Sequence, residues 1–151
     1  MPQSLVQVYV HIVFSTKNRY PFLRDPAARH SVFSYLGGIC NNKECPIITI
    51  GGVADHVHLL CGMGRTVAIA DLIRDLKRDS SKWIKGEHPG LHDFQWQLGY
   101  GAFSASPSHV PALLKYIANQ EEHHRKVSFQ DEFRRLCAKY GLKIDERYVW
   151  D

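Results

Sequence analysis

Two histidines separated by one residue are the first feature of this 151-residue sequence that suggests chemistry. His56 and His58 lie in the stretch 51–61, which joins two apolar runs that read as short buried strands linked by a glycine-containing turn. Side chains alternate between faces along a strand, so both imidazoles project from one face, about 7 Å apart. Such a pair can share one divalent metal ion, although strand histidines that bind nothing are the more common outcome.

A tyrosine and a glutamine form a second pair, some sixty residues downstream. Tyr116 and Gln120 lie four residues apart in a predicted helix, so they project from one side of it. A tyrosine at a helix edge usually only packs its ring and exposes its hydroxyl. Two imidazoles and an amide oxygen, however, would leave coordination positions of a Mg²⁺ or Mn²⁺ ion open for a phosphate oxygen. A tyrosine beside that ion can attack phosphorus and form a covalent phosphotyrosine.

Length and composition limit the classes of protein that this sequence can encode. With 44% hydrophobic and 23% charged residues, the chain is predicted to form one globular domain over residues 1–151. The formal charge of +4 permits a nucleic-acid partner without requiring one. No apolar run approaches the roughly 20 residues that cross a bilayer, and the N-terminus lacks the features of a secretory signal. We therefore expect a cytoplasmic protein that does not associate with membranes.

The hydrophobic pattern predicts an alternation of strands and helices. The strands are expected at 5–15, on either side of the turn in 51–61, and at 94–104; the helices at 26–41 after Asp25, at 67–85 after Thr66, from Ser108 past 120, and in a C-terminal helix and tail at 127–151. One four-stranded, mainly antiparallel sheet with helices packed on it is the simplest arrangement of this order. The fold class is therefore predicted to be α+β, of the ferredoxin-like type.

Basic residues gather at two places that suit a phosphate backbone. A solvated face is the ordinary explanation of such a run, and part of it complements the helix dipole. The late half of the 67–85 helix is nevertheless cationic enough to predict a phosphate-binding ridge. The candidate DNA-binding residues are Lys17 and Arg19 after the first strand, and Arg74, Lys77, Arg78 and Lys82 on the helix. His11, on the first strand, is expected to be an ordinary core histidine, with a supporting role beside the metal as the alternative.

Three sequence motifs follow one another along the chain: Gly52-Val-Ala-Asp-His-Val-His-Leu-Leu, Phe94-Gln-Trp-Gln-Leu-Gly-Tyr-Gly-Ala-Phe-Ser, and Tyr116-Ile-Ala-Asn-Gln-Glu-Glu-His-His. Together they resemble the single-tyrosine HUH transposases of small bacterial insertion sequences, over nearly the whole chain. The resemblance implies that His56, His58 and Gln120 are metal ligands and that Tyr116 is the nucleophile. It also implies a substrate of single-stranded DNA with hairpins, a divalent metal without a nucleotide cofactor, a 5′-phosphotyrosine intermediate, and a homodimer in which subunits can exchange helices.

Three alternatives remain open at this point. The same resemblance extends to domesticated relatives that act on repetitive extragenic palindromes, which the tail 127–151 favours. A catalytically silent module could bind hairpin DNA by the basic helix and by stacking bases on the sheet aromatics Tyr9, Phe94 and Trp96. A replication or mobilisation endonuclease is the least favoured, because such proteins usually carry additional regions for which this chain has no room.

Overall fold

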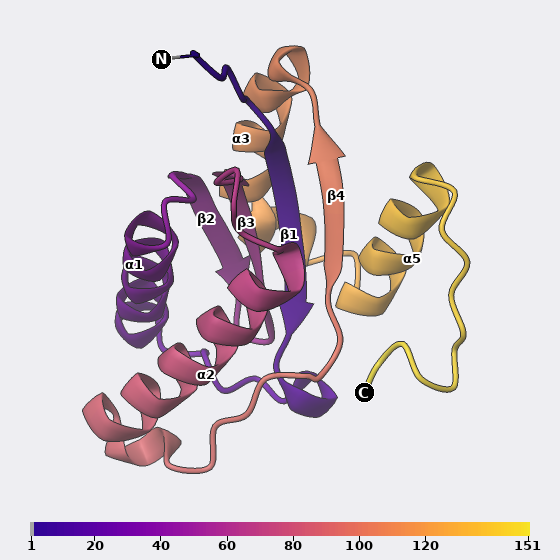
Figure 1. Cartoon of the computed structure of the whole chain (residues 1–151). Helices are drawn as coiled ribbons and strands as arrows, with labels where there is room; N and C mark the ends of the chain where they lie inside the picture. Colours follow the sequence, from indigo (N-terminus) through magenta and orange to yellow (C-terminus); the bar gives the residue numbers. More distant parts are fainter. Residues whose placement is uncertain (1) are drawn as a thin grey trace.

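A four-stranded antiparallel sheet forms the centre of the computed structural model, which describes residues 2–151. The strands are β1 (Tyr9–Ser15), β2 (Ile47–Val53), β3 (His56–Gly62) and β4 (Gly101–Ala105). They lie in the order β2-β3-β1-β4, and every neighbouring pair is antiparallel (Figure 1). The predicted ferredoxin-like α+β fold is confirmed.

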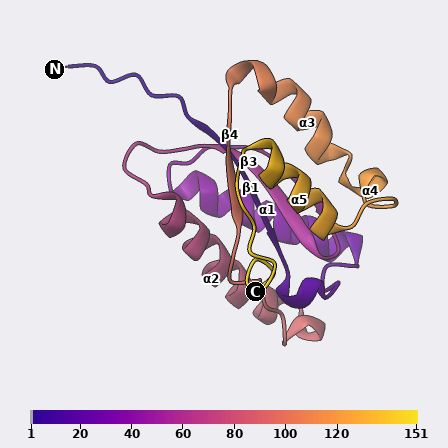
Figure 2. The same ribbon diagram turned by 90° about the vertical axis from the view of Figure 1, so that its right-hand side faces the viewer.

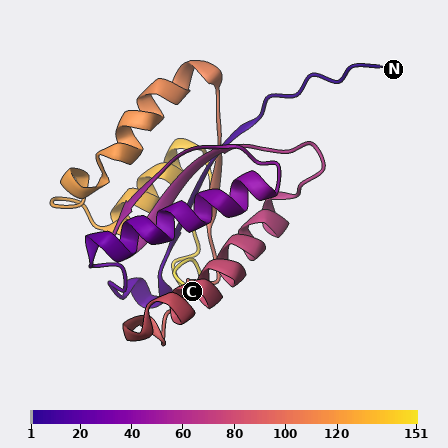
Figure 3. The same ribbon diagram turned by 90° about the vertical axis from the view of Figure 1, so that its left-hand side faces the viewer.

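Two long helices cover one face of this sheet. α1 (Pro26–Asn42) and α2 (Ile69–Glu87) lie side by side (Figure 3) and pack on the large apolar side chains that β1 and β3 send to that face. α1 begins as predicted, because the Asp25 side chain accepts a hydrogen bond from the amide of Ala28. The predicted start of α2 was wrong: residues 64–67 form a separate turn, so Ala68 rather than Thr66 precedes the first helical residue.

Three further helices lie on the opposite face of the sheet (Figure 2). α3 (Val110–Ala118) and α4 (Gln120–His123) contact β2, and α5 (Phe129–Lys139) packs on β1 and β4 through Phe129 and Phe133. α3 approaches so closely that a Cβ atom on Gly51 would lie 2.3 Å from the carbonyl oxygen of Ile117. Glycine at this position therefore sets how near α3 can come to the sheet.

The helix expected from Ser108 past residue 120 is interrupted. Ser108 lies inside a short 3-10 turn, η3 (Pro107–His109), and does not cap α3. Asn119 then leaves helical geometry with φ −97° and ψ 19°, and its amide is shared between the carbonyls of Lys115 and Tyr116. Tyr116 thus lies in the last turn of α3 while Gln120 begins α4, so the two lie on different helices.

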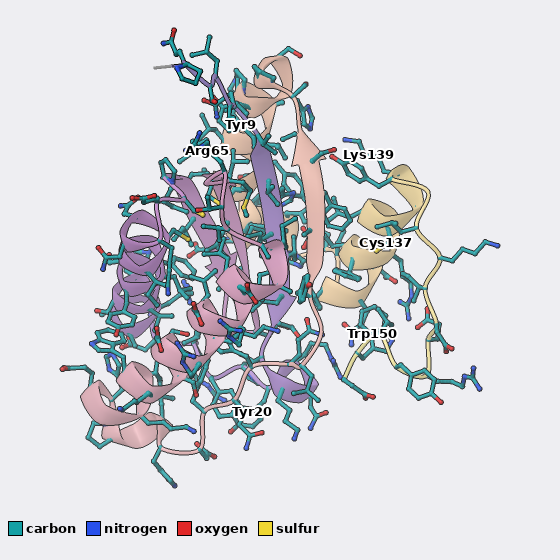
Figure 4. All side chains as sticks on the ribbon, viewed as in Figure 1. Tyr9, Tyr20, Arg65, Cys137, Lys139 and Trp150 are labelled. Atoms are coloured by element: carbon teal, nitrogen blue, oxygen red, sulfur yellow. The ribbon has the colours of Figure 1, made fainter. Side chains whose placement is uncertain are left out.

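The fourth strand is shorter than the predicted 94–104. Only Gly101–Ala105 pair with β1, whereas Trp96 makes a single bridge with Thr16. The amides of Leu98 and Gly99 donate instead to the carbonyl oxygen of Asp151, each at 3.0 Å. The segment before β4 is therefore paired with the C-terminal tail, which returns beneath α5 and places Trp150 against Phe133 (Figure 4).

Two more short helices complete the described structure, η1 (Lys17–Arg19) and η2 (Pro89–Leu91). η1 continues directly from the end of β1, where Ser15 pairs with His56 across the strands. From residue 2 to residue 151, none of the helices has both the length and the apolar character needed to cross a membrane.

Candidate functional site

Both strand histidines face the layer formed by α3, α4 and α5. His56 and His58 are fully buried on that side of β3, whereas Val57 and Leu59 pack toward α1 and α2. This is the alternation that the sequence predicts. The Nε2 atom of His56 lies 3.1 Å from the amide oxygen of Gln120, so the histidine pair and Gln120 do converge on one place.

A carboxylate from the C-terminal helix lies at the centre of this site. Glu132 of α5 is 2% exposed, and its Oε1 accepts from His58 Nε2 at 2.8 Å. Its Oε2 accepts from the Gln120 amide nitrogen at 3.2 Å and from the Tyr116 hydroxyl. Burial opposes ionisation, yet the neighbouring imidazoles, those of His56 and His58 among them, hold the pKa of this carboxyl far below its ordinary value. The site therefore contains a fixed negative charge.

Tyr116 reaches the same centre from the last turn of α3. Its ring meets that of His58 edge-on, with the centroids 5.7 Å apart, and its hydroxyl donates to Glu132. Burial, followed by the negative charge of Glu132, raises the pKa of Tyr116 above its ordinary value. The hydroxyl borders a cavity of about 390 Å³ between α3 and α5, whose cationic lining comes from Arg135 and Lys139. The phenol is well placed to react but is held in its protonated form.

Each histidine of the pair is oriented by a second hydrogen bond. Asp55 Oδ1 lies 2.7 Å from His56 Nδ1, and His11 Nε2 lies 2.8 Å from His58 Nδ1. Fixing one ring nitrogen directs the other toward a ligand, as in most protein metal sites. His11 is buried, as expected of a core histidine, and its bond to His58 also places it beside the candidate ligands, in the supporting position that was the alternative.

The donor set fits a divalent cation. One ligand atom from each of His56, His58, His124 and Glu132 lies within 4.8 Å of all the others. His124 Nε2 is buried and lies 3.1 Å from Glu132 Oε1, yet in a direction that makes no hydrogen bond. An unpartnered nitrogen beside an ionised carboxylate is the arrangement that a metal ion would satisfy.

Sequence reasoning did not assign Glu132 or His124 to the site. The signal for Glu132 is its spacing: it falls between Phe129 and Phe133 on the apolar face of α5, where an unpaired carboxylate would be costly. No comparable local pattern marks His124, whose position depends on the turn that follows α4.

The predicted DNA-binding cations do not lie together beside Tyr116. Those of α2 are on the opposite face of the sheet (Figures 1 and 2). Arg74 and Arg78 form ion pairs with the helix aspartates Asp71, Asp75 and Asp79, and Lys82 is exposed. Lys17 is exposed in η1, and Arg19 donates to the carbonyl oxygen of Trp150 at 2.9 Å. Contact of any of them with DNA stays a prediction.

Lys77 has a structural environment unlike that of its neighbours. Its Nζ donates to the carbonyls of Gln97, Leu98 and Gly99 at 2.8, 3.2 and 2.7 Å, and burial lowers its pKa to about 8. We expect Lys77→Met to reduce the free energy of unfolding by about 1–3 kcal/mol, because three carbonyls lose their donor. Urea denaturation measures this, with exposed Lys82→Met as the matched control. Equal stability of the two variants would contradict it.

The buried histidines predict how the stability of the metal-free protein depends on pH. Burial lowers the pKa of His11 to about 3 and of His58 to about 4, so the unfolded chain binds more protons below pH 6.5 and stability falls on acidification. For His56, the effect of burial is outweighed by Asp55 and Glu132, which raise its pKa to about 9. The stabilisation of the folded protein by protonated His56 is therefore fully present below pH 6.5 and is lost as the pH rises through 9. Urea denaturation in EDTA should therefore show maximal stability near pH 6.5; stability that rises steadily with pH would contradict this.

The aromatic residues proposed to stack on bases are mostly inaccessible. Phe94 is fully buried and Trp96 is 7% exposed, and both pack in the core beneath α2. The indole nitrogen of Trp96 donates to Ser80 at 2.9 Å. Neither ring offers a free face, so the prediction that bases stack on Phe94 and Trp96 was wrong. This result weakens the hypothesis of a module that binds hairpins without catalysis.

Comparisons of the sequence and of the structure with known proteins both find transposases. Residues 4–120 match the family described as "Transposase IS200 like". The ISDra2 transposase TnpA of Deinococcus radiodurans is 26% identical over 121 residues, which are 77% of this chain and 86% of that protein. A crystal structure described as a transposase of the same organism superposes with a TM-score of 0.64 and 23% identity, covering 80% of this chain and 95% of the other. A REP-associated tyrosine transposase bound to a REP hairpin superposes with a TM-score of 0.58 and 14% identity, covering 84% and 74%.

Proposed function

Since this chain belongs to the family of IS200-like transposases, we propose that it is a metal-dependent transposase that cuts and rejoins single-stranded DNA next to hairpins through a 5′-phosphotyrosine. The observation that carries the proposal is the convergence of His56, His58 and Gln120 with the Tyr116 hydroxyl around one carboxylate. These four residues come from β3, α3 and α4 of one chain.

The reaction is a transesterification, which needs no nucleotide cofactor. The Tyr116 oxygen attacks phosphorus, the bond from phosphorus to the 3′-oxygen breaks, and that oxygen takes up a proton to leave a free 3′-OH. The hydroxyl proton passes to a base; in the DNA-free protein it is donated to Glu132 Oε2, whose lowered pKa makes this carboxylate a group that holds the hydroxyl rather than a strong base. A later attack by a 3′-OH on the phosphotyrosine rejoins the strand and regenerates the tyrosine.

A divalent metal would be held by His56, His58 and Gln120, with Mg²⁺ or Mn²⁺ as the expected ion. When bound, it supplies positive charge that neutralises the phosphate oxygens of the transition state. The chain itself positions the nucleophile: the Tyr116 hydroxyl is fixed by Glu132 in the DNA-free protein, and Arg135 and Lys139 in the lining of the adjacent cavity offer positive charge for a DNA strand.

Binding of the rest of the DNA is proposed to use the cations at the chain's surface. The set consists of Lys17, Arg19, Arg74, Lys77, Arg78 and Lys82, with Lys77 acting by supporting the 97–99 segment rather than by direct contact. Because α2 lies across the sheet from α3, which carries Tyr116, the hairpin and the cleavage position would occupy different faces of the protein. A homodimer would let the α2 surface of one subunit hold DNA that the other cuts, and light scattering with and without DNA tests that assembly.

The test is a covalent attachment assay. The protein is incubated with labelled single-stranded DNA from the regions flanking its own gene, in Mg²⁺, Mn²⁺ or EDTA, and resolved on denaturing gels. A protein–DNA band that forms only with metal supports the proposal, and sequencing of the released fragment locates the cut. Tight hairpin binding without any such band would contradict it and favour a palindrome-binding role.

A further inference from the structure

Two residues beyond the predicted ligand set lie at the metal centre. His124, which follows α4, and Glu132 of α5 approach His56 and His58 so closely that the four candidate ligand atoms are within 4.8 Å of one another. The side chains of His56, His58 and Glu132 are at most 1% exposed and that of His124 is 8% exposed. A group of three imidazoles and one carboxylate, closed off from water, has the composition of a protein metal site.

The hydrogen bonds around these imidazoles leave all three Nε2 atoms directed inward. Nδ1 of His56 is held by Asp55, Nδ1 of His58 by His11, and Nδ1 of His124 by the carbonyl oxygen of Val127 at 2.6 Å. A carbonyl only accepts, so Nδ1 of His124 carries the proton and its Nε2 presents a lone pair. That lone pair faces Glu132 Oε1, another electron donor, 3.1 Å away and without a hydrogen bond.

We propose that His124 and Glu132 are metal ligands that join His56 and His58 in a closed, four-ligand site in the DNA-free protein. Three imidazole nitrogens and one carboxylate oxygen are ligands that suit Zn²⁺ and similar transition metals better than Mg²⁺. This rests on the proposed function, since it concerns the same centre, and it adds two residues that the resemblance does not supply.

The same carboxylate connects this closed site to the nucleophile. Glu132 directs Oε1 at the histidines and Oε2 at the Tyr116 hydroxyl. A four-ligand site leaves no position for a phosphate oxygen. Displacement of Glu132 by DNA would open one coordination position on the metal and would free the Tyr116 hydroxyl. Gln120 is placed to serve as a ligand in this open form of the site, because its amide oxygen is 3.1 Å from His56 Nε2.

The test is a titration of the metal-free, full-length protein with Co²⁺ followed by competition with Zn²⁺, without DNA. The wild-type protein should show the intense visible absorption of four-coordinate cobalt. His124→Ala and Glu132→Gln should lose this band and bind at least about tenfold more weakly, while the exposed matched controls His30→Ala and Glu122→Gln keep both. Unchanged spectra and affinities in His124→Ala and Glu132→Gln would overturn the proposal.

Two further measurements keep the result interpretable. If either variant fails to fold, X-ray absorption of the zinc-loaded wild-type protein counts its ligands directly: three imidazoles support the proposal and two overturn it. Gln120→Ala should keep the cobalt band yet reduce covalent attachment to DNA. Loss of the band in Gln120→Ala but not in His124→Ala would overturn the closed site, whereas absence of covalent attachment in the wild-type protein would contradict only the proposed function.

Discussion

Tyr116→Phe should abolish covalent attachment of the protein to DNA, reducing it by at least about 10³-fold. The substitution removes the hydroxyl oxygen proposed to attack phosphorus and keeps the ring that packs edge-on against His58. Hairpin affinity should be nearly unchanged, because the hydroxyl contacts Glu132 rather than the protein's exposed surface. Denaturing gels measure attachment, and a mobility shift under native conditions measures binding.

The matched control is Tyr148→Phe, which removes an equivalent hydroxyl from a residue that is 64% exposed on the C-terminal tail. Tyr148→Phe should attach DNA at the wild-type level. Attachment that persisted in Tyr116→Phe and was lost in Tyr148→Phe would assign the nucleophile to the tail. Parallel loss of hairpin binding in Tyr116→Phe would instead show that the hydroxyl is needed to hold DNA.

The parts of the site that local sequence pattern predicts are those positioned by regular structure. His56 and His58 share a face because strand side chains alternate, and the apolar Val57 and Leu59 fix which face packs toward α1 and α2. The start of α1 is equally local, since Asp25 and Pro26 are the residues that begin helices. In each case the physical cause lies within a few residues of its effect.

The parts that were missed depend on contacts between distant segments. The chain leaves the sheet at Leu98 and Gly99 because their amides donate to Asp151, at the far end of the chain, and because Lys77 in α2 binds the carbonyls of residues 97–99. Glu132 reaches the histidines only because α5 folds back across β1 and β4. No spacing rule connects a strand at 56–58 with a carboxylate at 132, so the complete ligand set could not be read from the sequence.

His11→Phe should lower the affinity for a divalent metal by about 10- to 100-fold, which is the usual effect of removing a residue that orients a ligand. When a metal ion replaces the Nε2–H bond to Glu132, His58 presents a lone pair at Nε2 only if its Nδ1 carries the proton, and that proton needs an acceptor. His11 Nε2, 2.8 Å away, is that acceptor, and burial keeps His11 neutral by lowering its pKa to about 3. Phenylalanine fills the space but leaves the His58 N–H buried without a partner.

His11→Gln distinguishes a role of His11 in orienting His58 from a merely structural role. The glutamine side chain offers an amide oxygen as acceptor, so it should recover part of the lost metal affinity, even though it packs less well than phenylalanine in this buried position. Titration calorimetry with Mn²⁺ and Zn²⁺ measures the affinities, and urea denaturation in EDTA measures the stability of each variant. If His11→Phe bound metal as tightly as the wild-type protein, the orientation of His58 would have to come from Glu132 alone, through the 2.8 Å bond at its other nitrogen.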